Sequence, residues 1–221
     1  MIAAKKTWVV IPAFNEGERI VPVIKEAHHH AQGVVVVDDG SSDSTSDQAQ
    51  GAGAIVLRHC INLGKGAALK TGCDFAIEQG AGRIVVIDAD GQHDPADIPR
   101  ILKALEGHDI VFSFRRLDTR MPFVLRLGNR VISSIVTILY HVRLRDTQCG
   151  FRAFSSEAYG QVRWDATDYS MESEMIARAG RNRLRYTEIP IATVYADKYK
   201  GTTVIDGVKI VADLLWWKVK R

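Results

Sequence analysis

The sequence predicts an α/β fold with a mainly parallel, doubly wound sheet, and three observations carry that prediction. Short apolar runs alternate with helical patterns from residue 7 to residue 114, at the spacing of β-α-β units. The runs Gly33 to Val37 and Val85 to Ile87 contain no polar residue, which is typical of strands buried on both faces of a parallel sheet. Both runs end in carboxylates, and open α/β sheets bind ligands at the carboxyl ends of their strands.

The remaining elements follow from the same patterns. Further strands are expected at Trp8 to Ile11, Ala54 to Leu57 and Asp109 to Phe114. Four helices are expected in the first half. The first runs from the turn at Phe14 to Gly17 through about His29, and the second follows the Ser and Thr residues at 41–45. The third is expected at Ala67 to Glu78 and the fourth at Pro95 to Leu105. The second half is expected to hold helices at Phe123 to Tyr140, Met171 to Ala179 and from Val204 onward, an extended segment at Leu184 to Val194 and a polar turn at Asp146 to Arg152.

A metal site is predicted directly after the strand at Val85 to Ile87. Asp88 and Asp90 are two residues apart, so both carboxylates can turn toward one point outside the sheet. Two such anions repel each other unless a cation lies between them, and hard oxygen ligands favour Mg²⁺ or Mn²⁺. Gln92 adds a neutral oxygen, and the cation could in turn hold a diphosphate. The alternative is a loop in which these Asp residues only cap and turn the chain.

An anion site is predicted at the turn Asn62 to Gly66. Glycines flank Lys65 at the amino end of the next helix, and helix amino ends attract anions. The turn is not a P-loop, because the Gly-X4-Gly-Lys-Ser/Thr pattern is absent from the sequence.

Composition narrows the class of protein. The chain has 221 residues, a net charge of +3 and a charged fraction of 25%, which is ordinary for a soluble protein and too weakly basic to indicate nucleic-acid binding. Its three widely spaced cysteines indicate neither a disulfide framework nor a zinc motif, and we interpret them as the cysteines of a reducing cytosol. The longest uncharged apolar run, Val131 to Val142, has 12 residues, fewer than the roughly 20 that span a bilayer.

Taken together, five motifs resemble the signature of glycosyltransferase family 2 in the same order. They are Pro12-Ala13-Phe14-Asn15-Glu16, the run from Val36 to Thr45, Asn62-Leu63-Gly64-Lys65-Gly66, Asp88-Ala89-Asp90-Gly91-Gln92-His93 and Asp146-Thr147-Gln148-Cys149-Gly150-Phe151-Arg152. Within that family the sequence is most similar to the dolichol-phosphate mannose synthase and polyprenyl-phosphate glycosyltransferase group. The motifs extend from residue 12 to residue 152, about two thirds of the chain.

The resemblance implies a GT-A fold, a nucleoside-diphosphate sugar donor such as GDP-mannose or a UDP-sugar, and inverting transfer. The residues implied to bind the nucleotide are Pro12, Phe14, Glu16, Asp39, Lys65, Asp88 and Ala89. Those implied to hold Mg²⁺ or Mn²⁺ are Asp88, Asp90 and Gln92, with Asp90 and Arg115 acting in catalysis. Arg115, Arg126 and Lys198 are expected to bind an acceptor phosphate; Lys198 replaces a family arginine, and Lys200 is its alternative.

The same resemblance implies one domain over residues 1–221. A nucleotide-sugar half reaches to about residue 115, an acceptor half to about residue 203, and an amphipathic helix covers about residues 204–221. The expected function is transfer of a hexose to a polyprenyl phosphate at the cytoplasmic face of a membrane. Two alternatives remain open: a soluble enzyme that glycosylates a sugar or protein hydroxyl, with Asp146 or Glu174 as base, and a non-catalytic nucleotide-binding relative. Glu172 and Glu174 could equally be a helix pair bonded to arginines.

The C-terminal helix is expected to lie on a membrane surface or against a membrane-embedded partner protein. Trp216 and Trp217 are adjacent, so with neighbours 100° apart they cannot both point into one narrow groove. Tryptophan favours the bilayer interface, and Lys218, Lys220 and Arg221 would meet anionic head groups. The alternative is that this helix packs back on the catalytic domain.

Overall fold

The computed structural model describes residues 5–115, 123–192 and 204–219; the side chains of residues 123–127 and 204–206 are not among those described. In these residues a seven-stranded sheet has the order β3-β2-β1-β4-β6-β5-β7. Its strands are β1 (Thr7–Ala13), β2 (Gly33–Asp38), β3 (Ile55–Arg58), β4 (Arg83–Val86), β5 (Ile110–Arg115), β6 (Arg152–Ser155) and β7 (Tyr186–Ile191). All described pairings are parallel except those of β6, which runs antiparallel to both β4 and β5. The predicted mainly parallel α/β sheet is confirmed.

Two apolar clusters lie on the two faces of the sheet, because successive side chains of a strand point to opposite sides. On β1, Val9 and Ile11 join one cluster, whereas Trp8 and Val10 join the other. Helices α1 (Ile20–His28), α2 (Thr45–Gly51) and α4 (Ile98–Leu105), the last preceded by the short 3₁₀ helix Pro95–Asp97, cover the first face. Helices α3 (Lys65–Glu78), α6 (Ser156–Val162) and α7 (Ser170–Arg181) cover the second.

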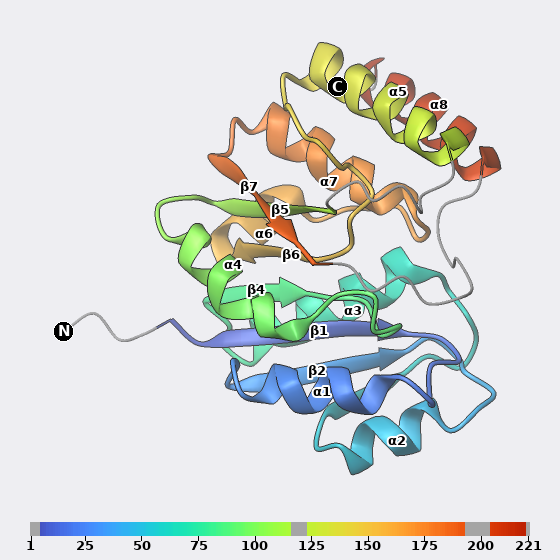
Figure 1. The fold of residues 1–221 in the computed structure, drawn as a ribbon, viewed down its shortest axis with the longest axis vertical. Coiled ribbons are helices and arrows are strands. Elements are labelled where there is room, and N and C mark those ends of the chain that lie inside the picture. The colour runs from blue at the N-terminus through green and yellow to red at the C-terminus, as the bar shows by residue number, and fades with distance from the viewer. Residues whose placement is uncertain (1–4, 116–122, 193–203, 220–221) are drawn as a thin grey trace.

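Two long helices form an outer layer against α7. These are α5 (Phe123–Tyr140) and α8 (Val204–Val219), which lie side by side at one end of the molecule (Figure 1). Ile210 and Leu214 of α8 are fully buried, and the Tyr140 hydroxyl donates to the Leu214 carbonyl at 2.6 Å. No helix in the described ranges has both the length and the apolar character to span a membrane.

The sequence patterns do not predict β6 or α6. Arg152 falls in a predicted polar turn, whereas in the structure it begins β6, the strand inserted between β4 and β5. A strand of four residues carries too little alternation to be recognised by its pattern. The other predicted strands and helices are present in the described residues, with ends shifted by a few residues.

Candidate active site

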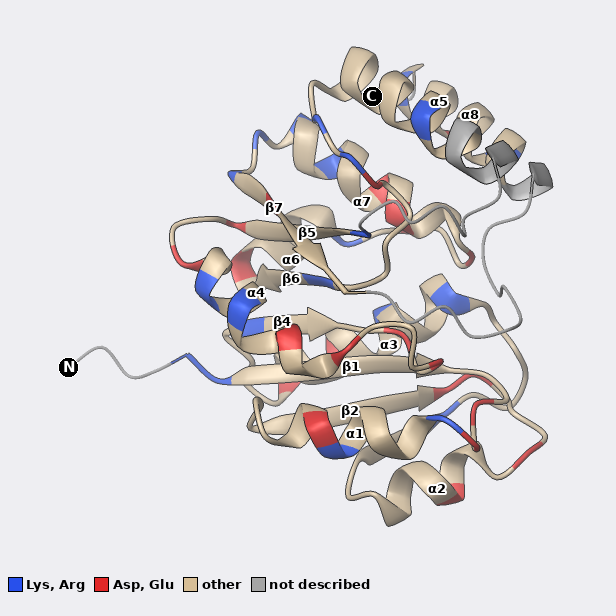
Figure 2. Cartoon of the chain, viewed as in Figure 1, with Lys and Arg blue, Asp and Glu red and all other residues tan. Residues whose placement is uncertain are grey.

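The carboxyl ends of β1, β2 and β4 lie at one edge of the sheet, because the three strands are parallel (Figure 1). Acidic side chains gather in the loops that follow β1 and β2 (Figure 2). Asp88 and Asp90 follow β4 at the same edge. The negative charge of Glu16, from the loop after β1, acts on Asp90, so segments far apart in sequence meet here as predicted.

Asp88 is held from two sides. Lys65, the first residue of α3, places its Nζ atom 2.7 Å from Oδ1 of Asp88 and 3.0 Å from Oε1 of Glu172 in the first turn of α7. On the other side is Gly150, where an added Cβ atom would lie only 2.4 Å from Oδ2 of Asp88. Burial alone would raise the pKa of Asp88, but the charge and hydrogen bond of Lys65, together with His93 and Arg115, outweigh burial and keep that pKa below its ordinary value. Asp88 is therefore an ionised carboxylate in a fixed position.

Asp90 is in the opposite electrostatic situation. Burial raises its pKa, and repulsion by the neighbouring Asp88 carboxylate raises it further. One of its oxygens accepts a hydrogen bond from the Gln92 backbone N–H at 3.0 Å. The negative charge of ionised Asp90 is thus only partly compensated, and a divalent cation would neutralise it.

The residues present fit an oxygen-ligated divalent cation. Within the described ranges no three His, Cys, Asp or Glu side chains gather into a metal cluster. Asp88 and Asp90 would therefore bind a cation together with neutral oxygens, such as that of Gln92, and with oxygens of a ligand. Mg²⁺ is commonly held in this way, by one or two carboxylates and substrate phosphates.

Arg115 ends β5 beside Asp146, in the loop before β6. Its Nε donates to Oδ2 of Asp146 at 2.7 Å and its Nη2 to Oδ1 at 3.2 Å, a two-bond pair. Asn129 of α5 donates to the same carboxylate and accepts from Thr147, which ties α5 to this loop. Burial would raise the pKa of Asp146, but Arg115 and the Gln148 backbone N–H together outweigh burial and the pKa is lowered. Asp146 is a weak candidate for a general base.

Arg152 is the residue that organises this loop, a role the sequence analysis missed. Its guanidinium is fully buried and donates to the carbonyl oxygens of Thr147, Cys149 and Glu172 at 2.8–3.0 Å. Those bonds join the loop before β6 to the first turn of α7. One signal in the sequence could have found it: an arginine directly after Phe151 at the end of a mostly polar motif.

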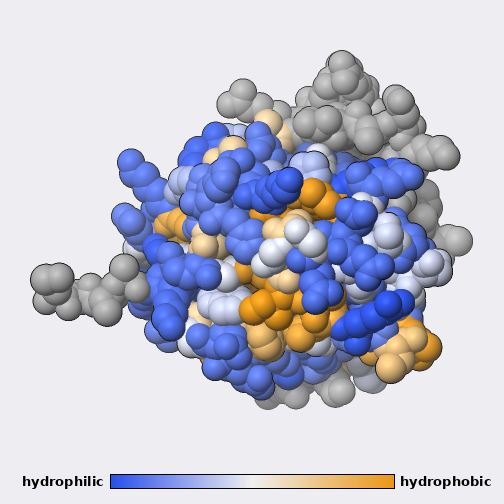
Figure 3. Space-filling view, turned by 90° about the horizontal axis from the view of Figure 1, so that it is seen from below, coloured by the Kyte–Doolittle hydropathy of each residue, from blue (hydrophilic) through white to orange (hydrophobic). Residues whose placement is uncertain are grey.

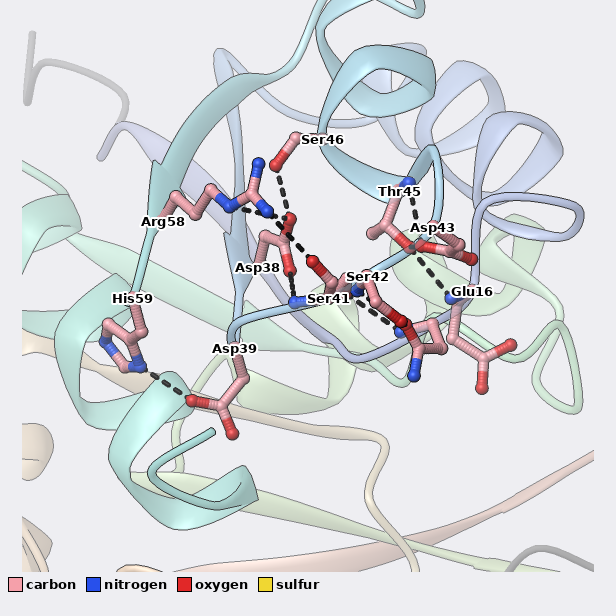
Figure 4. A network of polar contacts seen from close by, with 11 residues as sticks. Glu16, Asp38, Asp39, Ser41, Ser42, Asp43, Thr45, Ser46, Arg58 and His59 are labelled. Atoms are coloured by element: carbon pink, nitrogen blue, oxygen red, sulfur yellow. Dashed lines mark hydrogen bonds and ion pairs between the residues drawn. The ribbon is translucent and has the colours of Figure 1, made fainter. Parts of the chain in front are cut away.

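The predicted nucleoside side of the site is an ordered network after β2 (Figure 4). Asp39 accepts from His59 at 2.7 Å and from the backbone N–H groups of Leu63 and Gly64 at 2.9 and 2.8 Å. The backbone N–H of Glu16 donates to Thr45, and the Glu16 carboxylate pairs with Arg19 at 2.9 Å. Both carboxylates therefore have protein partners and are fixed in place.

Three other predicted nucleotide contacts differ in exposure. Pro12 is buried in β1 opposite Val37, and Ala89 is buried between the two aspartates. Phe14, directly after β1, is 44% exposed and is the one of the three that presents a large apolar surface to a ligand. An exposed aromatic ring at a ligand-binding sheet edge suits stacking on a base.

The glycines around Lys65 lie against the backbone of residues 166 and 167. A Cβ atom on Gly64 or Gly66 would lie 2.4 Å from the carbonyl oxygen of Thr167 or Ala166. The Ala67 N–H donates to Thr167 at 3.1 Å, so a backbone carbonyl already covers the amino end of α3. One N–H of this helix end is therefore taken, and the anion site predicted at this turn stays a prediction that rests on the Lys65 side chain.

The remaining predicted residues are settled only in part. The side chain of Arg126 and the whole of Lys198 and Lys200 lie outside the described residues. Glu174 is buried and accepts hydrogen bonds from the N–H groups of Asp165 and Ala166 and from Arg178. Of the two roles left open for Glu174, the geometry therefore favours a structural residue bonded to an arginine over a catalytic base. His93 is buried against Phe151, and burial lowers its pKa to about 4, which makes it neutral at pH 7.

Comparison with known proteins gives a consistent result. A family model described as glycosyl transferase family 2 matches residues 8–163. An uncharacterised protein of Methanocaldococcus jannaschii is 38% identical, with 96% of this chain and 92% of that protein aligned. The UDP-N-acetylglucosamine–dolichyl-phosphate N-acetylglucosaminyltransferase of Methanococcus voltae is 32% identical, with 100% of this chain and 99% of that enzyme aligned.

Among solved structures, glucosyl-3-phosphoglycerate synthase from Mycobacterium tuberculosis, crystallised with Mg²⁺ and UDP, has the same GT-A fold. The TM-score is 0.77 at 21% identity, over 98% of this chain and 80% of the synthase. Other crystals of that synthase hold Mn²⁺ with UDP or UDP-glucose. At this identity the likeness establishes the fold.

Proposed function

Because this chain belongs to glycosyl transferase family 2, we propose that it moves a hexose of the mannose or glucose type from a nucleoside-diphosphate sugar to a polyprenyl phosphate of the dolichyl type. The family membership confirms the motif resemblance and makes the chain a glycosyltransferase. The name of the Methanococcus voltae relative supports the acceptor class, since that enzyme acts on dolichyl phosphate. The same name adds an N-acetylhexosamine to the sugars worth testing.

The donor is proposed to bind at the Asp88–Asp90 edge. Asp88, Asp90 and Gln92 would hold Mg²⁺ or Mn²⁺, which supplies positive charge to the departing diphosphate. Lys65, close to Asp88, adds charge on the same side. Phe14 offers its exposed ring to the base, and Glu16 and Asp39 shape the nucleoside pocket. Divalent metals bound with UDP in the structurally similar synthase support this assignment.

The proposal of a phosphate acceptor rests on whether Asp146 or Glu174 could serve as a general base. A hydroxyl acceptor needs a base to remove its proton, whereas a phosphate monoester is already anionic near neutral pH. Arg115 donates hydrogen bonds to both oxygens of Asp146 and lowers its pKa. The Glu174 carboxylate is occupied by hydrogen bonds from α7 and from the loop before it, so neither group is well suited to act as a base. The acceptor oxygen then attacks the anomeric carbon opposite the diphosphate, which leaves with the bonding electron pair.

Polyprenyl phosphate is therefore expected to be a far better acceptor than the matching polyprenol, by at least about 10²-fold, because the alcohol lacks a base. Both should be assayed with GDP-mannose, UDP-glucose and UDP-N-acetylglucosamine in the presence of Mn²⁺. Release of nucleoside diphosphate and formation of the lipid-linked sugar are the measurements. Equal rates with phosphate and alcohol would reject the lipid phosphate and return Asp146 to the role of base.

We place the enzyme at the cytoplasmic face of a membrane, with α5 and α8 toward the lipid. The exposed apolar side chains of these helices, the α5–α8 apolar face, are Val131, Ile138, Val208, Leu215, Trp216 and Val219. Trp217 packs against the core whereas Trp216 is 62% exposed, as the adjacent positions require. The end of the molecule near α1 and α2 is largely hydrophilic, with apolar areas near its centre and at its rim (Figure 3). Cys60, Cys73 and Cys149 are free, which supports a reducing compartment.

The structure changes one part of this expectation. Lys218, which the sequence assigned to lipid head groups, donates to the carbonyl oxygen of Leu139 at 2.7 Å and lies over the Tyr140 ring. Lys220 and Arg221 are outside the described residues. The side of α8 that carries Ile210 and Leu214 packs on the rest of the protein, as the alternative expected. The membrane proposal rests on the exposed apolar side chains of the same helix.

A Trp216→Ser, Val219→Ser double variant is expected to bind vesicles at least about tenfold more weakly than the wild type. Losing the burial of two large apolar side chains removes more than the 1.4 kcal/mol that corresponds to tenfold. Co-sedimentation with phosphatidylserine-containing vesicles measures it, with Ile55→Ser of the edge strand β3 as the control. Absence of wild-type binding would exclude lipid and leave a membrane-embedded protein as the occupant of this face.

A further inference from the structure

The sequence left Glu172 between a structural and a catalytic role, and the structure gives it a specific connection. Glu172 comes from the first turn of α7, 107 positions after Lys65, yet its Oε1 lies 3.0 Å from the Lys65 ammonium. The same ammonium contacts Asp88 at 2.7 Å. Three separate segments, α3, the end of β4 and α7, are thus joined through one lysine, whose side chain is only 15% exposed.

The second oxygen of Glu172 argues against a purely structural role. Glu172 is 3% exposed, and among the described residues its Oε2 is buried without a hydrogen-bond partner. A buried carboxylate oxygen without a partner destabilises a fold. Glu174, two residues later and equally buried, shows the contrasting structural case, since both of its oxygens are engaged by backbone N–H groups or by Arg178.

A second ion pair, in addition to the one with Asp88, is needed to fix the position of the Lys65 ammonium. The four-carbon stem of lysine is flexible, and its ammonium has three N–H donors, so one ion pair alone fixes it poorly. Two donors directed at Asp88 and Glu172 leave the third for a phosphate oxygen. The Tyr169 ring, 5.7 Å from Nζ, closes another side of the ammonium.

We propose that Glu172 is a positioning residue that acts through Lys65: it holds the ammonium against Asp88, and so keeps both groups in place for the donor's diphosphate. The inference rests on the proposed function, because the ligand it serves is the nucleoside-diphosphate part of the donor. Glu172 itself touches Lys65 and no reacting atom. Its effect should therefore vanish once Lys65 is removed.

A double-mutant cycle tests this dependence. The proteins are the wild type, Glu172→Gln, Lys65→Met and the double variant, and the measurement is the Kd of UDP and GDP by calorimetry, with Mn²⁺ and again in EDTA. Glu172→Gln is expected to weaken binding by about tenfold, in the range for residues that orient a ligand-binding group. The double variant should match Lys65→Met within about twofold, because residues that act through each other are not additive.

Kinetics and a matched control separate positioning from folding. Glu172→Gln should raise the donor KM and leave the acceptor KM unchanged. Glu174→Gln, on the same helix and equally buried, should lower the melting temperature and leave the nucleotide Kd unchanged. If Glu172→Gln is poorly folded, Glu172→Asp keeps the charge one methylene shorter and should bind with intermediate affinity.

The outcomes are distinct. Wild-type affinity in Glu172→Gln, or losses that add fully in the double variant, would overturn the positioning role while the proposed function stands. If the wild type binds neither UDP nor GDP under any of these conditions, the proposed donor fails and the inference fails with it.

Discussion

Asp90→Ala is expected to slow sugar transfer by about 10³-fold while the protein stays folded. Metal stabilisation of a departing diphosphate is worth several kcal/mol, and each 1.36 kcal/mol changes the rate tenfold. The charge of Asp90 is only partly compensated, because burial and then Asp88 raise its pKa by more than Gln92 and Lys65 lower it. Removing that ionised carboxylate should leave the metal-free protein at least as stable near pH 7. Transfer rate, Mn²⁺-dependent nucleotide binding by calorimetry and thermal melting measure the three effects.

The sign of the pH dependence follows from the same pKa. A carboxyl whose pKa is raised on folding holds its proton more tightly in the native state, so it lowers stability as pH rises through its titration. Asp90→Ala should therefore lose less stability than the wild type when pH rises above the ordinary Asp range without metal. Asp94→Asn is the control, because Asp94 is exposed and caps the next turn through Ala96, a role that Asn fills equally well. An Asp90→Ala protein with full activity and metal-dependent binding would remove the metal assignment.

Secondary-structure elements could be predicted from the sequence where an apolar periodicity extends over enough residues. Strands β1, β2 and β5 and the long helices follow from apolar periodicity and caps, which depend on neighbours along the chain. The insertion of β6 between β4 and β5 does not, because a four-residue strand gains its identity from two partners distant in sequence. Local patterns cannot give the order of strands in a sheet.

The site was predicted as a set of residues and not as a set of contacts. Asp88, Asp90 and Lys65 were identified from motifs, but their arrangement depends on Glu172 and Gly150, which lie 107 and 85 positions beyond Lys65. The pairing of Arg115 with Asp146 joins residues 31 positions apart and weakens the alternative in which Asp146 serves as the base for a hydroxyl acceptor. Charges change their chemical role with their partners, and the partners are set by tertiary structure.

Gly150 shows how closely the loop before β6 approaches Asp88, one of the two aspartates proposed to hold a metal. Its added Cβ would lie 2.4 Å from Oδ2 and 2.9 Å from Cγ of Asp88, whereas ordinary van der Waals contacts begin near 3.4 Å. The Asp88 carboxylate has little room to retreat, because Lys65 holds its other oxygen at 2.7 Å. The loop is equally constrained, since Arg152 bonds the carbonyl oxygens of Thr147 and Cys149.

Gly150→Ala is therefore expected to reduce transfer by about 10²-fold, the typical effect of displacing a catalytic group by roughly 1 Å. The methyl group should push Asp88 away from the position that Lys65 and the donor share, so nucleotide affinity should fall together with the rate. Gly160→Ala is the matched control: Gly160 lies in α6 with nothing within 4 Å of its added Cβ, and alanine there should slightly raise stability. Transfer rates, calorimetric Kd values for UDP and GDP, and melting curves of the three proteins decide the question. Wild-type affinity and rate in a folded Gly150→Ala protein would show that Asp88 can move without loss, which would contradict its role as a fixed ligand.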